Sequence, residues 1–345
     1  LQIDPPNALV SPGGSSKFRA IATYEDGSTQ DVTAFSLWRI SGNEAAFVEG
    51  GRVSVALHAV RGIPAQIQAS FSGNLSAPAT LNINLFLYAL NNSDRSITGL
   101  VCDLQGLLST LSATNTRTGT APNYGATDPR GRYLYVTHFT ENSVWAFDIG
   151  TDGKLAKISE TSIGAGQGGS GLVLDPDGRY LYAAAGGNDK IRFYKINSNG
   201  SLTQHPASPV GSGDFPVTPA ISPNGRFLYA PHLQGAQVAG YRVNTDGSLT
   251  ALSGFPIKTG DTPQSFSFHP SGHFAYVCTS ANDQVRGYRV GDDGSLTQLA
   301  GSPYSAGDYP INLDVSPDGR NLYVANRDSD DISAFSLGTD GSLAA

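Results

Sequence analysis

The sequence predicts an all-β protein built largely from repeated four-stranded units, and two observations support this fold class. Two residue types recur at a fixed step of 47 along most of the chain of 345 residues. The tyrosines at this step are Tyr88, Tyr135, Tyr182, Tyr229, Tyr276 and Tyr323, and the glycines are Gly106, Gly153, Gly200, Gly247, Gly294 and Gly341. The chain also contains 41 glycines and 20 prolines, which indicates many turns between short strands. A period of this length is typical of supersecondary units that bury their apolar faces against their neighbours.

Residues 216–255 show how one repeat is expected to fold. A turn at 222–226 and a hairpin turn at 244–247 separate runs of mainly apolar residues. The runs, each predicted to be a strand, are 216–221, 227–231, 238–243 and 248–252. Four short strands per repeat predict the blade of a β-propeller; a solenoid is the alternative, although its coils are usually shorter.

The first strand of the repeat has one apolar face and one face of small or polar residues. Phe266 and Phe268 alternate with Ser265 and Ser267 in one repeat. Blades converge at the axis of a propeller, where bulky side chains on both faces of this strand would not fit. The alternation therefore favours the propeller.

Residues 1–85 lie outside the repeat and are predicted to form a separate domain. Short alternating runs at 18–24, 51–55, 65–71 and 80–84 suit a small antiparallel sandwich. The stretch 24–33, followed by Leu37 and Trp38, resembles the bacterial Ig-like group 2 domain, in which such a stretch joins two strands and a core tryptophan. The resemblance implies a stalk or spacer on an exported surface protein.

Residues 86–345 resemble the lactonase-type seven-bladed propeller family, which includes 6-phosphogluconolactonase-like and carboxymuconate-cyclase-like proteins. The residues that carry the resemblance are 316–326, then Ile332, then 340–343. Seven blades of 47 residues need about 329 residues, and 86–345 supply 260. We therefore expect about six blades, or a truncated set of seven.

Both ends of the repeated region are irregular. The first repeat has no Asp-Pro-x-Gly-Arg turn before Tyr88, and the last stops at Ala345, where we expect no outer strand. A ring that is open at such a seam exposes strand edges and apolar faces. The sequence therefore predicts self-association through the incomplete seam.

Composition excludes several classes of partner. The net charge of -7 argues against nucleic acid, and no apolar run is long enough to predict a membrane span. The chain has neither methionine nor a signal peptide, so we expect a processed form of a secreted, periplasmic or cell-surface protein. Cys102 and Cys278 are expected to be two unpaired thiols, with a long-range disulfide as the alternative. No metal or cofactor is predicted, because neither the cysteines nor the acidic turns at 292–294 and 328–331 have ligand spacing.

Two histidines are the candidate catalytic residues. His138 and His232 each lie three residues after a tyrosine of the repeat, at the end of the second strand. Imidazole titrates near neutral pH, which suits acid–base catalysis. The alternative is a hydrogen-bonding role in the loop, in place of the asparagines Asn91 and Asn326, which are predicted ligand-binding residues in the same column.

A second polar column follows the loop that leads to the first strand of each repeat. Its predicted ligand-binding residues are Asn123, Tyr124, Gln264, Asn312 and, two residues deeper, Asp314. They suit a surface that contacts a sugar or lactone, or else the rim of a water-filled channel. The glycine-rich segment 164–171 opens no helix, so a phosphate-binding loop is not expected.

The sequence favours an exported, non-catalytic propeller on an Ig-like stalk that binds a glycan, a lactone or a surface protein. The repeats keep their register without insertions, whereas enzymes usually build pockets from loops that differ between blades. The alternative is a lactone hydrolase that acts at the mouth of the propeller channel, with His138 and His232 near the site. No nucleophile motif decides between them.

Overall fold

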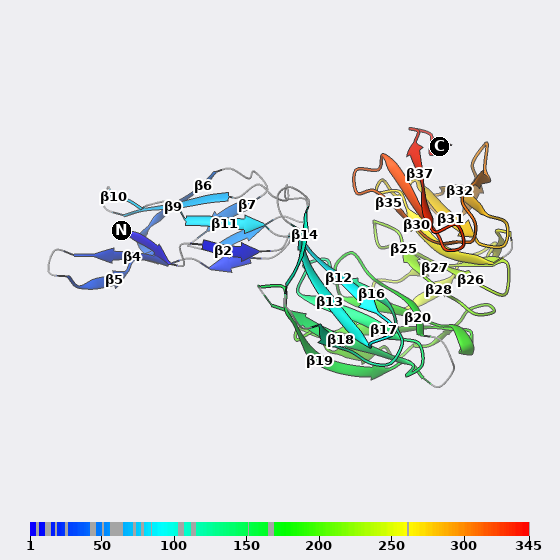
Figure 1. Ribbon diagram of the computed structural model, residues 1–345, viewed down its shortest axis with the longest axis horizontal. Coiled ribbons are helices and arrows are strands. Elements are labelled where there is room, and N and C mark those ends of the chain that lie inside the picture. The colour runs from blue at the N-terminus through cyan, green and yellow to red at the C-terminus, as the bar shows by residue number, and fades with distance from the viewer. Residues whose placement is uncertain are drawn as a thin grey trace. The chain divides into compact units, whose positions relative to one another are not determined.

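The protein is all-β in the computed structural model, as predicted (Figure 1). Beside the strands, the described residues include two short 3-10 helices, η1 (Thr33–Phe35) and η2 (Gly186–Asn188). The structure describes residues 1–4, 7–10, 15–17, 19–24, 27–41, 46–49, 52–55, 65–71, 74–76, 79–83, 85–102, 107–111, 115–150, 152–164, 169–260 and 262–344. The chain divides into two compact units, 1–118 with 127–134 and 147–157, and 119–126 with 135–146 and 158–345. No helix within the described ranges is long and apolar enough to cross a membrane.

The described residues between 1 and 83 form three sheets. Their strands are β1 (Gln2–Asp4), β2 (Asn7–Val10), β3 (Ser15–Lys17), β4 (Arg19–Thr23), β5 (Thr29–Asp31), β6 (Leu37–Ser41), β7 (Ala46–Glu49), β8 (Arg52–Val55), β9 (Ala65–Phe71), β10 (Asn74–Leu75) and β11 (Ala79–Ile83). The strand orders are β1-β4-β5, β3-β8-β7 and β10-β9-β11-β2, with β6 also paired to β9. The four runs expected to be strands are found as β4, β8, β9 and β11, but β11 pairs with β2 in parallel, unlike the antiparallel arrangement expected. Glu25 and Asp26 of the Ig-like stretch lie outside the described residues.

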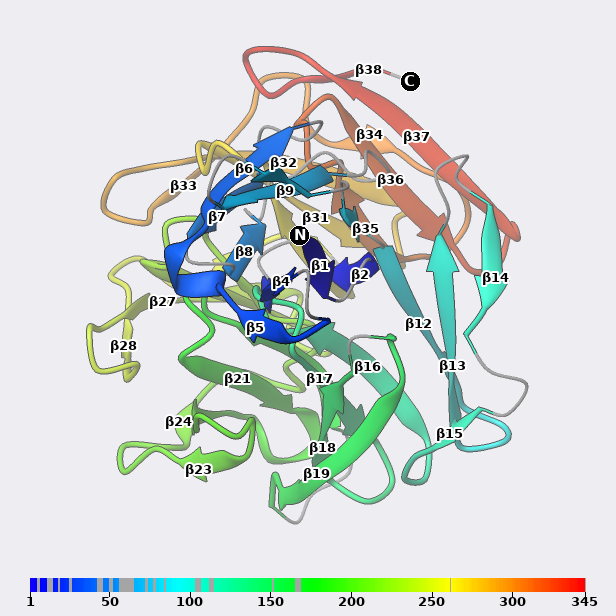
Figure 2. The same ribbon diagram turned by 90° about the vertical axis from the view of Figure 1, so that its left-hand side faces the viewer.

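The remaining described strands form six antiparallel sheets of blade topology. They are β12 (Leu85–Asn91), β13 (Ser96–Cys102), β14 (Leu108–Thr110), β15 (Thr116–Arg117), β16 (Pro122–Thr127), β17 (Tyr133–His138), β18 (Ser143–Ile149), β19 (Leu155–Ser162), β20 (Gly169–Leu174), β21 (Tyr180–Ala185), β22 (Lys190–Ile196), β23 (Leu202–Gln204), β24 (Val210–Gly211), β25 (Ala220–Ile221), β26 (Phe227–His232), β27 (Gln237–Val243), β28 (Leu249–Ala251), β29 (Ile257–Lys258), β30 (Pro263–Phe268), β31 (Phe274–Thr279), β32 (Gln284–Val290), β33 (Leu296–Gln298), β34 (Tyr304–Ser305), β35 (Pro310–Val315), β36 (Asn321–Asn326), β37 (Asp331–Leu337) and β38 (Leu343–Ala344). Each sheet runs in chain order, as in β30-β31-β32-β33. The sheets from β20 to β38 are arranged around one centre, with β20, β25, β30 and β35 in contact in that order (Figure 2).

The structure corrects the expected strands in three details. The strand expected at 216–221 is reduced to β25, because Pro216 and Pro219 have no N–H to donate to a ladder. A short outer strand, β38, does form at the end of the last sheet, where none was expected. Short additional strands, such as β29 and β34, pair with the third strand of their sheets and were not foreseen.

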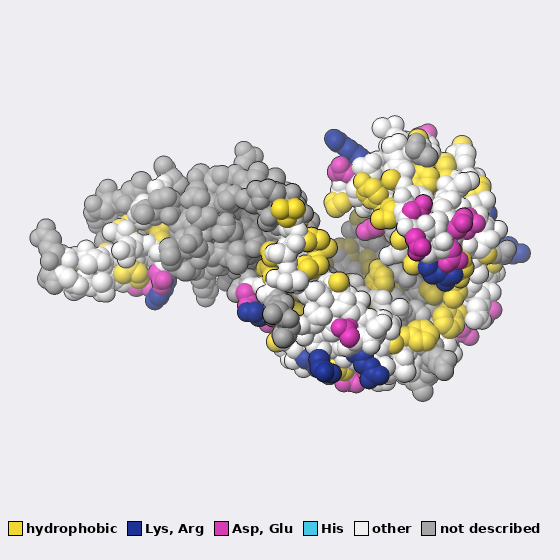
Figure 3. Space-filling model, viewed as in Figure 1, with side chains coloured by type: hydrophobic (Ala, Val, Ile, Leu, Met, Phe, Trp, Pro, Cys, Tyr) yellow, Lys and Arg dark blue, Asp and Glu magenta, His cyan; other side chains and the backbone are white. Residues whose placement is uncertain are grey.

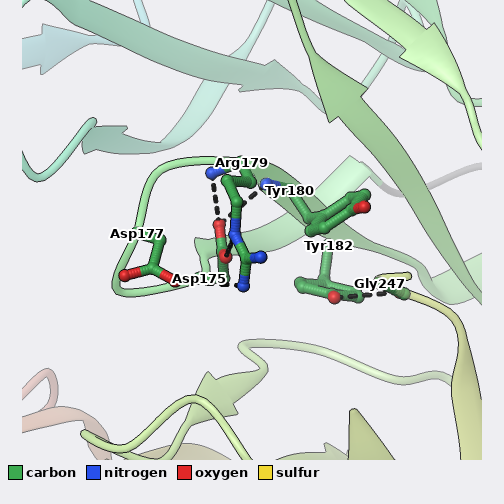
Figure 4. Close-up of polar contacts among 6 residues, drawn as sticks. All are labelled: Asp175, Asp177, Arg179, Tyr180, Tyr182 and Gly247. Atoms are coloured by element: carbon green, nitrogen blue, oxygen red, sulfur yellow. Dashed lines mark hydrogen bonds and ion pairs between the residues drawn. The ribbon is translucent and has the colours of Figure 1, made fainter. Parts of the chain in front are cut away.

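In four repeats the turn before the tyrosine strand is held by the side chain that opens it, which is Asp128, Asp175, Ser222 or Ser316. In the third repeat Oδ1 of Asp175 accepts the backbone N–H groups of Arg179 at 2.6 Å and Tyr180 at 2.7 Å (Figure 4). Arg179 also pairs with Asp177 across the turn at 3.0 Å. Gly178 has φ of 67°, a conformation that glycine adopts without strain. The same residue types therefore recur because these turns need an acceptor at the start and a glycine near the end.

The tyrosine and glycine columns are hydrogen-bonded to each other across neighbouring sheets. The hydroxyl of Tyr182 donates to the carbonyl of Gly247 at 2.9 Å (Figure 4). The equivalent pairs are Tyr88 with Gly153 at 2.8 Å, Tyr135 with Gly200 at 2.9 Å, Tyr229 with Gly294 at 2.6 Å and Tyr276 with Gly341 at 2.8 Å. Each of these five tyrosines thus reaches the hairpin turn of the next repeat. Gly106, the first glycine of the column, lies outside the described residues.

The hydrophobic core lies between successive sheets. One cluster joins β21 and β22 to β26 and β27, a second joins β25–β27 to β30–β32, and a third joins β31 and β32 to β35–β38. Cys278 is buried in the third cluster and belongs to no disulfide, so the long-range disulfide is not formed. On the face shown in Figure 3, Lys and Arg side chains lie in separate small groups and form no continuous basic stripe.

Candidate functional site

A pocket of about 300 Å³ lies where the innermost strands of successive sheets converge. It is lined by Tyr124, Val173, Thr218, Pro219, Ala220, Ile221, Pro223, Ser265, Phe266, Ser267, Phe268, Asn312, Leu313 and Asp314. Most of these residues belong to two columns of the repeat. The first column contains Tyr124, Thr218, Ser265 and Asn312, and the second contains Val173, Ala220, Ser267 and Asp314. The small inner face of the first strand, noted in the sequence, therefore forms the wall of the pocket.

Hydrogen bonds between neighbouring sheets join residues that are 47 apart. Ser265 Oγ donates to Asn312 Oδ1 at 2.8 Å, and Ser267 Oγ donates to Asp314 Oδ1 at 2.9 Å. The backbone N–H of Val315 donates to the same Oδ1 at 2.9 Å. Two donors thus fix one oxygen of the Asp314 carboxylate. Its other oxygen, Oδ2, accepts no hydrogen bond from the described residues and is available to a ligand or a water.

Tyr124 supplies a phenol to the pocket from β16. Burial raises the pKa of Tyr124, and the negative charge of Asp314 raises it further. The phenol therefore keeps its proton at neutral pH and can donate a hydrogen bond. The backbone at this point is fixed, because the N–H of Tyr124 donates to Thr137 Oγ1 at 3.2 Å and Asn123 Nδ2 donates to the carbonyl of Ser170 at 3.0 Å.

The close approach of β20 depends on glycine. A Cβ atom on Gly171 would lie 2.6 Å from Cα of Thr218 in the next repeat. A larger residue would force the two strands apart and open the wall of the pocket. This close approach explains why the repeat column that reads Tyr124, Thr218, Ser265 and Asn312 has glycine in one repeat.

Of the residues predicted to bind a ligand, three line the pocket and four do not. Tyr124, Asn312 and Asp314 line it. The remaining four bond to neighbouring strands or loops: Asn123 to Ser170, Gln264 to Ser280, Asn91 to Ser96 and Thr98, and Asn326 to Asp331 and Ser333. Thr218, Ser265 and Ser267 also line the pocket. Thr218 and Ser265 belong to the polar column recognised in the sequence, but none of the three was among the predicted ligand-binding residues.

The two candidate histidines lie outside the pocket lining. His232 is buried, and its Nε2 accepts the backbone N–H of Gly213 at 3.0 Å and contacts Ser212 Oγ at 2.8 Å. His138 is also buried and accepts the N–H of Gly119 through Nε2 at 3.1 Å. Burial lowers the pKa of His232, which favours the neutral imidazole that accepts these bonds. The geometry supports the loop-bonding alternative for both residues; their catalytic role stays a prediction.

Metal binding has no candidate among the ranges that the structure describes. They contain no group of three or more His, Cys, Asp or Glu side chains close enough to hold an ion. The predicted glycine-rich segment is described only at its ends, since 165–168 lie outside the described residues. The side chains that line the pocket offer one carboxylate, one phenol, hydroxyls and an amide.

Comparison with known proteins identifies the family. The family model "Lactonase, 7-bladed beta-propeller" matches residues 67–344. A comparison with curated proteins finds no match. The match begins within β9, and the family has seven blades, so neither the boundary at residue 85 nor the count of about six blades is established by it.

Solved structures share the fold at low sequence identity. A putative 6-phosphogluconolactonase from Bacteroides fragilis has 23% identity and a TM-score of 0.66, with 82% of this chain and 89% of that chain covered. One from Bacteroides uniformis has 21% identity and a TM-score of 0.65, with 90% and 94% covered. The periplasmic gluconolactonase of Pseudomonas aeruginosa has 20% identity and a TM-score of 0.60, with 97% and 93% covered. At these identities the likeness concerns the fold alone. With four-stranded sheets around one centre and a family match over most of its length, the chain belongs to the lactonase family of seven-bladed β-propellers.

Proposed function

We propose that the protein hydrolyses a lactone in the pocket formed by β16, β20, β25, β30 and β35. The observation that carries the proposal is that Asp314 and Tyr124, an acid with an available oxygen and a protonated phenol, line one pocket in a chain of the lactonase family. The likeness to a gluconolactonase and to putative 6-phosphogluconolactonases supports the same chemistry. These comparisons favour the hydrolase over the non-catalytic binding protein.

The proposed reaction uses the two groups in distinct roles. Oδ2 of Asp314 takes a proton from a water, whose oxygen attacks the lactone carbonyl carbon. The hydroxyl of Tyr124 donates a hydrogen bond to the oxyanion that forms. The ring C–O bond then breaks, and the leaving oxygen takes the proton from Asp314, which yields the open hydroxy acid. One water is consumed, and the carboxylate returns to its starting state.

The test is a panel of lactones assayed with the full chain and three variants. Asp314→Asn should lower kcat/KM by about 10²–10⁴-fold, since it removes the base. Tyr124→Phe should lower kcat/KM by about 10²–10³-fold, since it removes one oxyanion donor. Asp318→Asn is the matched control: Asp318 lies in the exposed turn of the same sheet, where its Oδ1 accepts Ser316 Oγ and the N–H of Arg320. Turnover that survives Asp314→Asn, or no turnover by the unmodified chain above the spontaneous rate, contradicts the proposal.

The Ig-like stalk and the export of the protein stay predictions from the sequence.

A second measurement addresses the histidines in the same assay. His232→Asn keeps a hydrogen-bonding side chain at the position where other repeats have Asn91 and Asn326. If His232 serves only to hold its loop, kcat per folded molecule of the variant should stay within about twofold of the unmodified chain. Loss of turnover in a folded variant would instead support a catalytic role for the imidazole.

A further inference from the structure

The pocket carries one negative charge and no positive charge. Asp314 is its sole carboxylate, and no Lys, Arg or His lines it among the described residues. The undescribed residues of the same compact unit are 165–168, Asp261 and Ala345, and the sequence at 165–168 reads Ala-Gly-Gln-Gly. None of these residues is basic. The unit that forms the pocket therefore has no undescribed cation to add to its wall.

This charge pattern is poorly suited to a phosphate group. Phosphate sites in proteins use Arg or Lys side chains, helix N-termini or clusters of backbone N–H groups. Here most of the wall is built from strands, and two of its residues, Pro219 and Pro223, have no N–H. A phosphate dianion in the pocket would also be repelled by the carboxylate of Asp314, which has the same sign of charge.

The same wall is well suited to neutral hydroxyl groups. The hydroxyl of Ser265 donates its hydrogen bond to Asn312, and that of Ser267 donates to Asp314. Both serine oxygens can therefore still accept a hydrogen bond from a ligand. Asn312 is bonded through Oδ1, so its Nδ2 remains a donor. The hydroxyls of Thr218 and Tyr124 can donate or accept. A volume of about 300 Å³ lies at the lower end of ligand pockets, which suits a single sugar-sized ring.

We infer that the substrate is an uncharged, polyhydroxylated lactone and that its phosphorylated counterpart is a poor substrate. This inference rests on the proposed hydrolase. It assigns Ser265, Ser267 and Asn312 to the recognition of ring hydroxyls, while Asp314 disfavours anions. The inference thus separates the two substrate types that the names of the structural neighbours suggest.

The test compares kcat/KM of the full chain for glucono-1,5-lactone and for its 6-phosphate at the same pH and ionic strength. We expect a preference of about 100-fold or more for the uncharged lactone. Thr218→Lys introduces a cation into the wall and should narrow the preference about tenfold. Thr297→Lys, in exposed β33 away from the pocket, is the matched control and should leave the ratio unchanged.

The outcomes distinguish this inference from the proposed function. An equal or greater kcat/KM for the phosphorylated lactone overturns the inference and leaves the hydrolase standing. An equal change of the ratio in both lysine variants also overturns it, because the wall of the pocket would then not set the preference. Failure of both lactones, together with every lactone of the wider panel, overturns the hydrolase itself.

Discussion

Replacing Tyr229 with phenylalanine removes one hydroxyl from the junction between two neighbouring sheets. The hydroxyl donates to the carbonyl of Gly294 at 2.6 Å, and both residues are buried. The ring itself stays packed, since it stacks on Phe266 with centroids 5.1 Å apart. The substitution therefore isolates the hydrogen bond from the hydrophobic contact.

The cost follows from what the carbonyl loses. A buried acceptor left without its donor destabilises a protein by about 1–3 kcal/mol. Tyr323 provides a control in the same column, because its side chain is 47% exposed and its hydroxyl has no hydrogen bond within the described residues. Tyr323→Phe should change the free energy of unfolding by less than about 0.5 kcal/mol.

The assay is urea unfolding of the full chain, followed by circular dichroism, for the unmodified protein and both variants. A chain of two units can unfold in more than one step. The midpoints of the two variants are therefore compared for the same unfolding transition. We expect Tyr229→Phe to lower the midpoint clearly and Tyr323→Phe to leave it almost unchanged. If both variants lower it equally, the hydroxyl-to-carbonyl bonds do not hold neighbouring sheets together and the reasoning fails.

Three further predictions concern the same framework. Gly247→Ala should destabilise the protein by more than Gly254→Ala in urea unfolding: both have positive φ, but a Cβ on Gly247 would lie 2.5 Å from the ring of Tyr180, and a Cβ on Gly254 would contact nothing within 4 Å. Burial lowers the pKa of His232, so its contribution to the free energy of unfolding is present above pH 6.5 and is lost as the pH falls. Between pH 7 and pH 5 the free energy of unfolding should therefore fall more steeply in the unmodified chain than in His232→Asn, by up to about 1.4 kcal/mol per pH unit. Equal slopes for the two proteins would contradict this. Burial raises the pKa of Tyr194 to about 12, so its contribution to the free energy of unfolding is intact below pH 10 and is lost between pH 10 and about 12. The absorbance of tyrosinate should therefore rise in two stages as the pH is raised, and the second stage should coincide with unfolding. A single smooth titration would refute this.

Much of the fold could be predicted because the signals for it are local. The turn at 175–179 needs an acceptor and a glycine, and both recur at the step of 47. The alternation of Phe266 and Phe268 with Ser265 and Ser267 predicted which face of β30 is apolar, and Phe266 is buried as expected. The shortened β25 was missed because the prolines were included in an otherwise apolar run.

The first sheet of the repeat begins at β12 without a preceding inner strand among the described residues.

The candidate site was only partly predictable. Tyr124, Asn312 and Asp314 were recognised as polar residues near the start of the first strand, and all three line the pocket. The histidines were selected for the chemistry of imidazole, and the structure gives them backbone hydrogen bonds outside the pocket. Asn91, Gln264 and Asn326 were selected by their position in the repeat, but their side chains bond to neighbouring strands or loops.

The sequence by itself determined the repeating unit: its four strands, its turns and the two columns of tyrosine and glycine. These features depend on backbone conformation and on contacts between near neighbours in the chain, so a period in the residues is enough to reveal them. Only the tertiary structure decided that the tyrosines of the column, Tyr323 excepted, bond to the glycine 65 residues later and that two columns meet in one pocket. Both results depend on how successive sheets pack side by side, because packing brings together residues whose separation along the chain carries no information about their distance in space.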